Sequence, residues 1–119
     1  MCNMEKQTLG KHERIRKRKQ YVIIYQKGKR SYSENFTAVV CRNQLGTKRL
    51  GIAVPKKVGC AVKRNRAKRL IREFFRLNKL KFSASYDFVI VVKKDISSLT
   101  YQDVCRELEN LLFKSADAR

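Results

Sequence analysis

One stretch of this chain, residues 56–81, combines a helical apolar stripe with a large excess of positive charge. When it is wound as an α-helix at about 100° per residue, five of its apolar residues fall within an arc of about 120°, typical of a face that packs against a core. The stripe consists of Ala67, Leu70, Ile71, Phe74 and Leu77. The basic residues of the opposite face are Arg64, Lys68, Arg69, Arg72, Arg76 and Lys79. The pattern predicts a helix that is fixed by one face and presents cations on the other.

The single sign of this charged face indicates a polyanionic partner. Eleven residues of the stretch are Lys or Arg, and only Glu73 is acidic. Like charges one helical turn apart repel each other, so a face that only needed solubility would mix its signs. The first 81 residues hold 24 basic and 4 acidic groups (+20), and the other 38 hold 5 and 6 (−1), which together give the net charge of +19. Nucleic-acid phosphates are the usual counterpart of such a surface, and we expect it to lie before residue 82.

The same region resembles the signature of the bacterial ribonuclease P protein subunit family. The signature's Arg-Asn-Arg triplet stands here as Arg64-Asn65-Arg66, followed by KRLIR at 68–72 and preceded by RLGIAVPKKVG at 49–59. Ala67 stands where the family usually carries a larger aliphatic residue. The resemblance covers roughly residues 10–115. It implies an RNA-binding subunit of an endoribonuclease that matures the 5′ end of tRNA, with catalysis and the Mg²⁺ ions held mainly by the RNA subunit.

The resemblance also implies which residues meet RNA. Those expected to bind the catalytic RNA are Lys56, Lys57, Arg64, Asn65, Arg66, Lys68, Arg69 and Arg72. Tyr21 and Tyr25 match the aromatic positions of a cleft that binds the 5′ leader of precursor tRNA, where rings can stack on bases. Two alternatives stay open: both tyrosines could simply pack a helix onto the sheet, and Asn65 could be a local cap instead of an RNA contact.

Patterning along the rest of the chain predicts a single α+β domain in the order αββαβα. The expected elements are a helix within 13–27, a loop at 31–35, strands at 36–42, 49–54 and 86–92, and a last helix that begins at Thr100. The β-branched residues at 22–24 would also suit a strand, and the family resemblance favours the helix. Residues 1–12 are expected to form a flexible basic tail, and 13–119 a single RNA-binding domain.

The resemblance implies the fold of the second domain of ribosomal protein S5, with a left-handed βαβ crossover in place of the usual right-handed one. In the strand at 49–54, Gly51 and Ala53 alternate with bulky residues. Small side chains there leave room for a helix or a ligand to come close. This face of the strand is therefore expected to lie against another part of the molecule or its partner.

Residues for self-contained catalysis or metal binding are sparse. The four cysteines (2, 41, 60 and 105) have no Cys-x-x-Cys spacing, and His12 is the only histidine, which argues against zinc. Among the ten scattered acids, Asp87 between two aromatic residues is more typical of a structural role. We expect no catalytic residue in the protein.

Location and partners follow from the same features. No apolar run reaches membrane-spanning length, and free cysteines suit a reducing cytoplasm. The expected partners are the catalytic RNA and precursor tRNA, with no membrane and no obligate protein. Charge and size fit a structural RNA-binding protein of ribosomal type equally well. A DNA-binding helix-turn-helix protein fits less well, because strands flank the basic helix.

Overall fold

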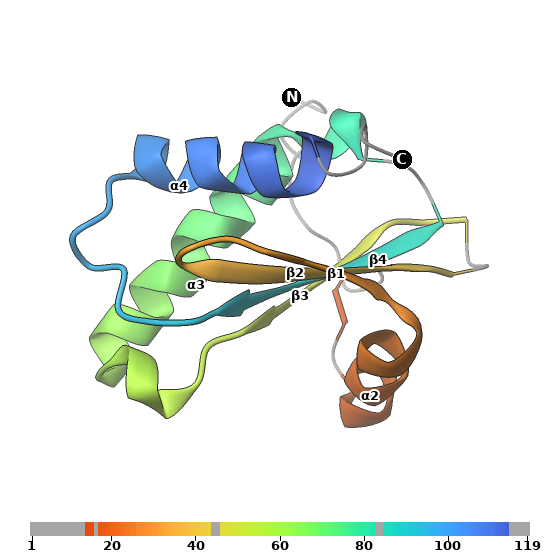
Figure 1. Ribbon diagram of the computed structural model, residues 1–119, viewed down its shortest axis with the longest axis horizontal. Coiled ribbons are helices and arrows are strands. Elements are labelled where there is room, and N and C mark those ends of the chain that lie inside the picture. Colours follow the sequence, from red (N-terminus) through yellow and green to blue (C-terminus); the bar gives the residue numbers. More distant parts are fainter. Residues whose placement is uncertain (1–13, 16, 44–45, 83–84, 115–119) are drawn as a thin grey trace, which may run out of the picture.

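The computed structural model describes residues 14–15, 17–43, 46–82 and 85–114, and it shows one sheet with helices on both faces (Figure 1). Its elements are α2 (Arg18–Lys27), β1 (Lys29–Tyr32), β2 (Phe36–Arg42), β3 (Arg49–Ala53), α3 (Ala61–Leu77), β4 (Tyr86–Val92) and α4 (Tyr101–Glu109). Short 3₁₀ turns lie at Lys56–Val58 and Lys79–Lys81, and a π-helical turn at Asn110–Lys114 follows α4. The α+β class is confirmed, but the predicted loop at 31–35 is wrong in its first part, because β1 adds a fourth strand.

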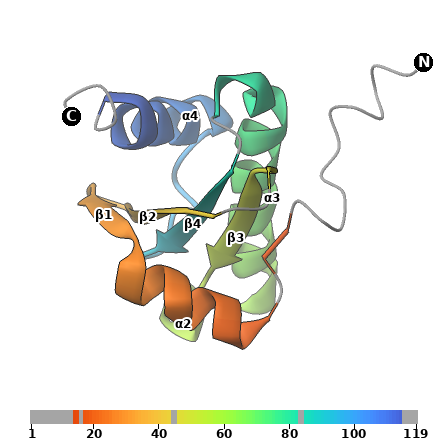
Figure 2. The same cartoon turned by 90° about the vertical axis from the view of Figure 1, so that its right-hand side faces the viewer.

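The strands lie in the order β1-β2-β4-β3. β2 pairs antiparallel with both β1 and β4, while β3 runs parallel to β4. In Figure 2 β3 and β4 run away from the viewer with β4 on the left of β3, and α3 returns on the upper side of the sheet. The β3–α3–β4 connection is therefore left-handed, as the family resemblance implied and against the general rule.

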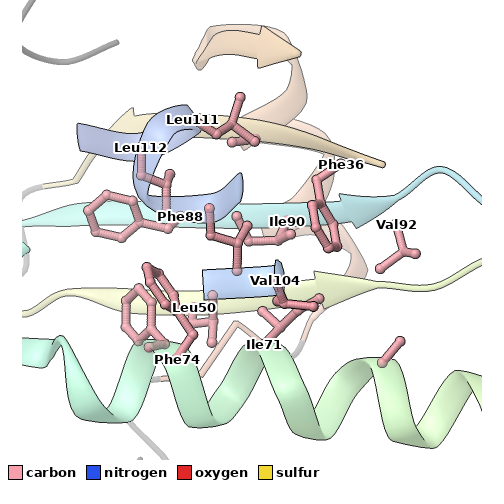
Figure 3. Close-up of a cluster of buried hydrophobic side chains, with 14 of the residues drawn as sticks. Phe36, Leu50, Ile71, Phe74, Phe88, Ile90, Val92, Val104, Leu111 and Leu112 are labelled. Atoms are coloured by element: carbon pink, nitrogen blue, oxygen red, sulfur yellow. The ribbon is translucent and has the colours of Figure 1, made fainter. Parts of the chain in front are cut away.

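The main core lies between the sheet and the helices α3 and α4. Figure 3 shows Phe36 and Ile90 of the sheet facing Ile71 of α3 and Val104 of α4. Alternation along β2 places Phe36 and Ala38 in this core and Val39 on the opposite face. The sheet is thus covered on both faces.

The apolar stripe of α3 differs from the prediction at its C-terminal end. Ala67, Ile71 and Phe74 are buried as expected, but Leu77 is 50% exposed and Phe75 is 1% exposed. The 3₁₀ turn after α3 returns Phe82 to the core, where its ring stacks on Phe75 with centroids 4.2 Å apart. The stripe therefore widens towards Phe75 at the point where the chain turns back.

On the other face of the sheet, α2 buries Ile24 against Val39 and Val89. The helix ends at Gly28, where a Cβ would lie 2.5 Å from the Val39 side chain and 2.6 Å from the Ile24 carbonyl oxygen. Only glycine allows β1 to follow α2 so closely. The space left by Gly51 is also filled from α2, because a Cβ there would lie 2.8 Å from the Tyr21 ring. A helix, and not an open ligand site, occupies that face of β3.

The last helix begins as its sequence predicted. The Thr100 hydroxyl accepts a hydrogen bond from the Asp103 amide at 3.1 Å, and the Asp103 carboxylate accepts one from the Thr100 amide at 3.0 Å. This reciprocal capping box satisfies two amides that the helix itself cannot. It fixes the start of α4 at residue 101.

Candidate nucleic-acid interface

The exposed face of α3 carries cations that no protein group engages in the described part of the chain. Arg69 and Arg72 are exposed, and Lys68 is half-buried beside them. The turn before the helix adds Lys56 and Lys57, both exposed. Val58, 1% exposed, anchors this turn in the core. The sequence therefore places a rigid cationic turn directly before a rigid cationic helix.

Other basic residues of α3 are engaged within the protein. Arg76 pairs with Glu73 one turn earlier, and the Lys63 ammonium lies 3.0 Å from a carboxylate oxygen of Asp95. The Ser97 hydroxyl and amide, together with Lys63, lower the pKa of Asp95 to about 2. Arg64 donates from Nε to the Gly59 carbonyl at 3.2 Å. The helix surface is thus divided between cations that face solvent and cations that hold the fold.

Arg66 belongs to the second group. Its guanidinium donates to the carbonyl oxygens of Ile96, at 3.2 Å, and Leu99, at 2.7 Å. The sequence assigned this residue to RNA binding, with its charged end projecting sideways from the apolar stripe. The structure directs that charged end onto the β4–α4 loop.

Asn65 is exposed within the second turn of α3 and is not a cap. The N-cap position of the helix is Cys60 and the C-cap is Asn78. Cys60 is exposed, and the amides of the first helical turn, led by that of Lys63, lower the pKa of its thiol. This excludes the interpretation of Asn65 as a helix cap, and the RNA contact stays a prediction.

A hollow of about 230 Å³ lies where α2, β3 and α3 meet. Apolar and aromatic residues and Arg14 line it on the side of the sheet and α2, and cations line it on the α3 side: Arg14, Ile15, Tyr21, Leu50, Ile52, Lys68 and Arg72. The sequence assigned Tyr21 to one RNA surface and Lys68 and Arg72 to another. The structure brings them together around one concave site at the β3 edge. Arg14 was not predicted there, because its place depends on the parallel bridge between residue 14 and Leu50.

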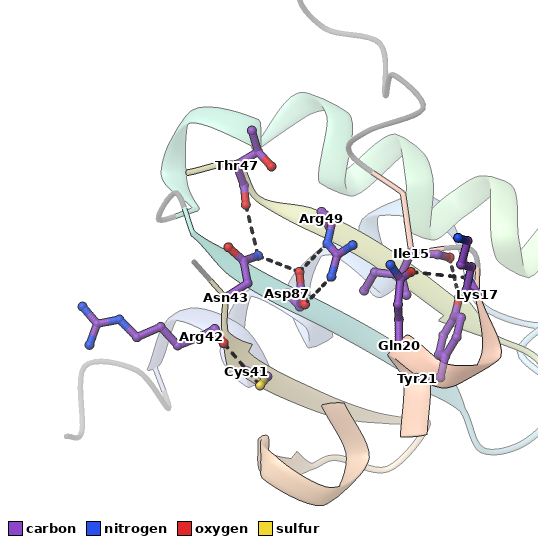
Figure 4. A network of polar contacts seen from close by, with 10 residues as sticks. All are labelled: Ile15, Lys17, Gln20, Tyr21, Cys41, Arg42, Asn43, Thr47, Arg49 and Asp87. Carbon is purple, nitrogen blue, oxygen red and sulfur yellow. Dashed lines mark hydrogen bonds and ion pairs between the residues drawn. The ribbon is translucent and has the colours of Figure 1, made fainter. Parts of the chain in front are cut away.

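The two tyrosines of α2 are both packed against the sheet, but to different extents. The Tyr21 hydroxyl donates to the Ile15 carbonyl at 3.1 Å, as Figure 4 shows, and its ring lies against Gly51. Tyr25 packs beside the Val39 and Val89 cluster, with its ring centroid 6.3 Å from that of Tyr21. Burial raises the pKa of both phenols. Packing therefore accounts for much of Tyr21, and for less of Tyr25.

Asp87, the acid singled out from the sequence, lies in a closed polar network (Figure 4). Both of its carboxylate oxygens accept from Arg49 at 2.8 Å, and one also accepts from Asn43 at 2.7 Å. The residue is 4% exposed. These contacts give it a structural role, holding the turn before β3 against β4.

Metal-binding clusters and membrane-spanning helices are both absent from the described residues. No group of three or more His, Cys, Asp or Glu side chains in residues 14–15, 17–43, 46–82 and 85–114 is placed to hold a metal ion. Over the same residues, no helix has the length and apolar character needed to cross a membrane.

Comparison with known proteins gives a consistent set of relatives. The family model described as Ribonuclease P matches residues 9–116. The ribonuclease P protein component of Syntrophus aciditrophicus is 62% identical over 111 residues, which cover 93% of each chain. A solved structure of a Staphylococcus aureus RNase P protein mutant with defective mRNA degradation activity superposes with a TM-score of 0.81, at 34% identity over 90% of each chain. The RNase P protein from Thermotoga maritima has a TM-score of 0.78 at 35% identity, covering 86% of this chain and 96% of its own.

Proposed function

This chain belongs to the family of ribonuclease P protein components. From that membership we propose that different parts of its surface bind the catalytic RNA and precursor tRNA. The exposed cations of α3 and of the turn before it bind the catalytic RNA. The hollow at the β3 edge, together with the α2 surface that carries Tyr25, binds the 5′ leader of precursor tRNA. The family's established role, in tRNA 5′ maturation, requires both partners at once.

The hollow at the β3 edge is the observation that carries this proposal. It places the Tyr21 ring, the apolar floor of Leu50 and Ile52, and the cations Lys68 and Arg72 around one concavity. Aromatic and apolar groups suit unstacked bases, and cations suit the backbone that joins them. A strand of RNA that leaves the α3 face would reach the α2 side through this hollow, past the cations Arg14, Lys68 and Arg72 in its lining.

We propose further that the RNA subunit carries the catalysis and most of the Mg²⁺. Mg²⁺ prefers oxygen ligands such as phosphates, and it would stabilise the charge that develops on the scissile phosphate. Two carboxylates packed within the fold, those of Asp87 and Glu107, accept hydrogen bonds from neighbouring protein donors. The contribution of the chain is then cationic: its exposed Lys and Arg residues lower the repulsion between two RNA molecules.

The test is reconstitution at limiting Mg²⁺. A bacterial ribonuclease P RNA is incubated with leader-bearing precursor tRNA, with and without the purified chain, and the rate of leader removal is measured. We expect the chain to raise the rate most at low Mg²⁺, where RNA repulsion is least screened. A ribosomal RNA-binding protein of similar size and charge serves as the control. An equal rate with both proteins would contradict a specific role.

A further inference from the structure

Arg66 makes contacts unlike those of the cations that surround it on α3. Two different nitrogens of its guanidinium donate to two different carbonyls, those of Ile96 and Leu99, both in the loop between β4 and α4. Its neighbour Ala67 is 0% exposed, so the Arg66 stem starts at the border of the buried face. A planar fork that spans two fixed acceptors is a geometry that arginine provides and lysine does not.

The loop that receives Arg66 is held at several points. Ile96 is 2% exposed within the main core. The Asp95 carboxylate accepts from the Ser97 amide at 2.8 Å and pairs with Lys63 at 3.0 Å. Thr100 then begins α4 with its capping box. Arg66 therefore joins α3 to a loop that is itself fixed to the core and to α4.

We infer that Arg66 is a positioning residue, which sets the orientation of α3 against the β4–α4 loop and so aims the exposed cations at the catalytic RNA. It is not itself a phosphate ligand. The inference rests on the proposed function, because it concerns how the same helix meets RNA. It also departs from the sequence-based assignment of this residue.

The test compares Arg66→Lys and Arg66→Ala with the same two substitutions at Arg69, an exposed residue three positions later. For each variant, the Tm, the affinity for a ribonuclease P RNA and the dependence of log affinity on log salt are measured. Binding is measured well below every Tm, so that all variants are folded. Arg66→Lys keeps the charge but cannot reproduce the fork, whereas Arg69→Lys keeps all that a phosphate contact needs.

A positioning role predicts that both Arg66 variants lower the Tm by about 4–8 °C and weaken RNA binding, while the salt slope is unchanged. Arg69→Ala is expected to leave the Tm unchanged and to flatten the slope by about 0.7–0.9, and Arg69→Lys to behave like the unsubstituted chain. If Arg66→Ala flattens the slope without changing the Tm, and Arg66→Lys restores binding, Arg66 is a phosphate ligand and the inference is overturned.

A second readout separates positioning from stability alone. Cys60, exposed at the start of α3, can carry a tethered iron–EDTA group after the other cysteines are replaced by alanine. Positioning predicts that Arg66→Lys shifts or broadens the pattern of RNA cleavage around this probe. A lower Tm with an unchanged pattern and affinity would reduce Arg66 to a stabilising residue and overturn the inference. If the unsubstituted chain fails to bind the RNA at all, the proposed function is itself overturned, whatever the Tm values show.

Discussion

Tyr21 and Tyr25 lie one turn apart on α2, but their surroundings favour different roles, packing for Tyr21 and base stacking for Tyr25. The hydroxyl end of Tyr21 is fixed twice, by contact with Gly51 and by the hydrogen bond to the Ile15 carbonyl. For Tyr25, no hydrogen bond of the hydroxyl is found among the described residues, and its ring is half-buried. Tyr21 shapes the wall between hollow and sheet, and Tyr25 is the better candidate for stacking on a base.

Gly51→Ala should displace the Tyr21 ring, because the new Cβ would lie 2.8 Å from ring atoms. We expect a loss of about 1–3 kcal/mol in the free energy of unfolding, measured by urea denaturation. In a Tyr21→Ala background the same change should cost almost nothing, because the clashing ring is gone. Equal costs in the two backgrounds would show that the contact is unimportant.

Tyr25→Ala should reduce affinity for precursor tRNA that carries a 5′ leader, by about 1–3 kcal/mol if the side chain stacks on one base. Affinity for mature tRNA should change little, and Tyr25→Phe should be nearly silent because stacking needs only the ring. Both substrates are measured in binding titrations beside a melting curve. Equal losses for both RNAs, together with a large drop in Tm, would assign Tyr25 to packing alone.

At the scale of elements, the helices were more predictable than their contacts. The periodicity of α3 located its buried face, but the burial of Phe75 depends on Phe82, which returns only after a turn. β1 was missed because two of its residues, Lys29 and Arg30, are cationic and its pattern lacks apolar alternation. Its strand conformation comes from pairing with β2, a tertiary effect that overrides local preference. Cations on an edge strand also discourage pairing with other chains.

The candidate site was predictable in kind but not in arrangement. A helix with basic residues on one face predicts RNA binding, and the family signature predicts which of its residues contact RNA. Periodicity could not show that Arg66 reaches the carbonyl oxygens of a loop 30 residues later, because the position of that loop depends on the crossover. For the same reason it could not bring Tyr21 beside Lys68 in one hollow.

Replacing Arg69 and Arg72 together by alanine should weaken binding to the catalytic RNA while leaving the fold intact, since both are exposed and the buried stripe is untouched. The slope of log affinity against log salt should flatten by about 0.7–0.9 for each phosphate that the variant no longer neutralises. Arg106→Ala, an exposed cation of α4 outside the proposed RNA surface, is the control and should leave the slope unchanged. An unaltered slope in the double variant would mean that this face points away from RNA.

Glu107 of α4 holds the turn between β1 and β2. Its carboxylate accepts from the Ser33 hydroxyl at 2.5 Å and from the Asn35 amide and side chain, both at 2.8 Å. Glu107→Gln replaces one accepting oxygen by a donor that would face these donors, and should cost about 1–3 kcal/mol of folding free energy in urea denaturation. Glu109→Gln, exposed on the same helix, should stay within about 0.5 kcal/mol of the unsubstituted chain. Equal stabilities of the two variants would contradict this role.

At the scale of the whole molecule, the proposed RNA surfaces lie on opposite sides of the sheet and meet only around the β3 edge. α3 lies on one face with α4, and α2 lies on the other (Figure 1). The concentration of charge before residue 82 matches this layout, because α4 and β4 contribute mainly core. Under the proposed function, the chain contacts RNA around this edge, and its last third supplies the supporting core.

The chain alone should leave precursor tRNA intact at every Mg²⁺ concentration, because its firmly held carboxylates are engaged in the fold. The measurement is a cleavage assay with RNA-free protein over a range of Mg²⁺. Asp87→Asn should lower the free energy of unfolding by about 3–5 kcal/mol, since it leaves the partly buried guanidinium of Arg49 without its counter-charge. Mg²⁺-dependent cleavage by the RNA-free chain, abolished by Asp87→Asn in a still folded protein, would refute this.

The position of β4 in the middle of the sheet has a consequence for folding during synthesis on the ribosome. β2 and β3 each hydrogen-bond to β4, which is the last strand to be synthesised. Until residue 92 has left the ribosome, β3 lacks its sheet partner β4, and the core lacks the side chains of α4. The strongly basic first 81 residues thus emerge before they can fold, within reach of abundant cellular RNA. We expect the nascent chain to engage RNA before its structure closes, so that assembly and folding of this subunit are coupled from synthesis onward.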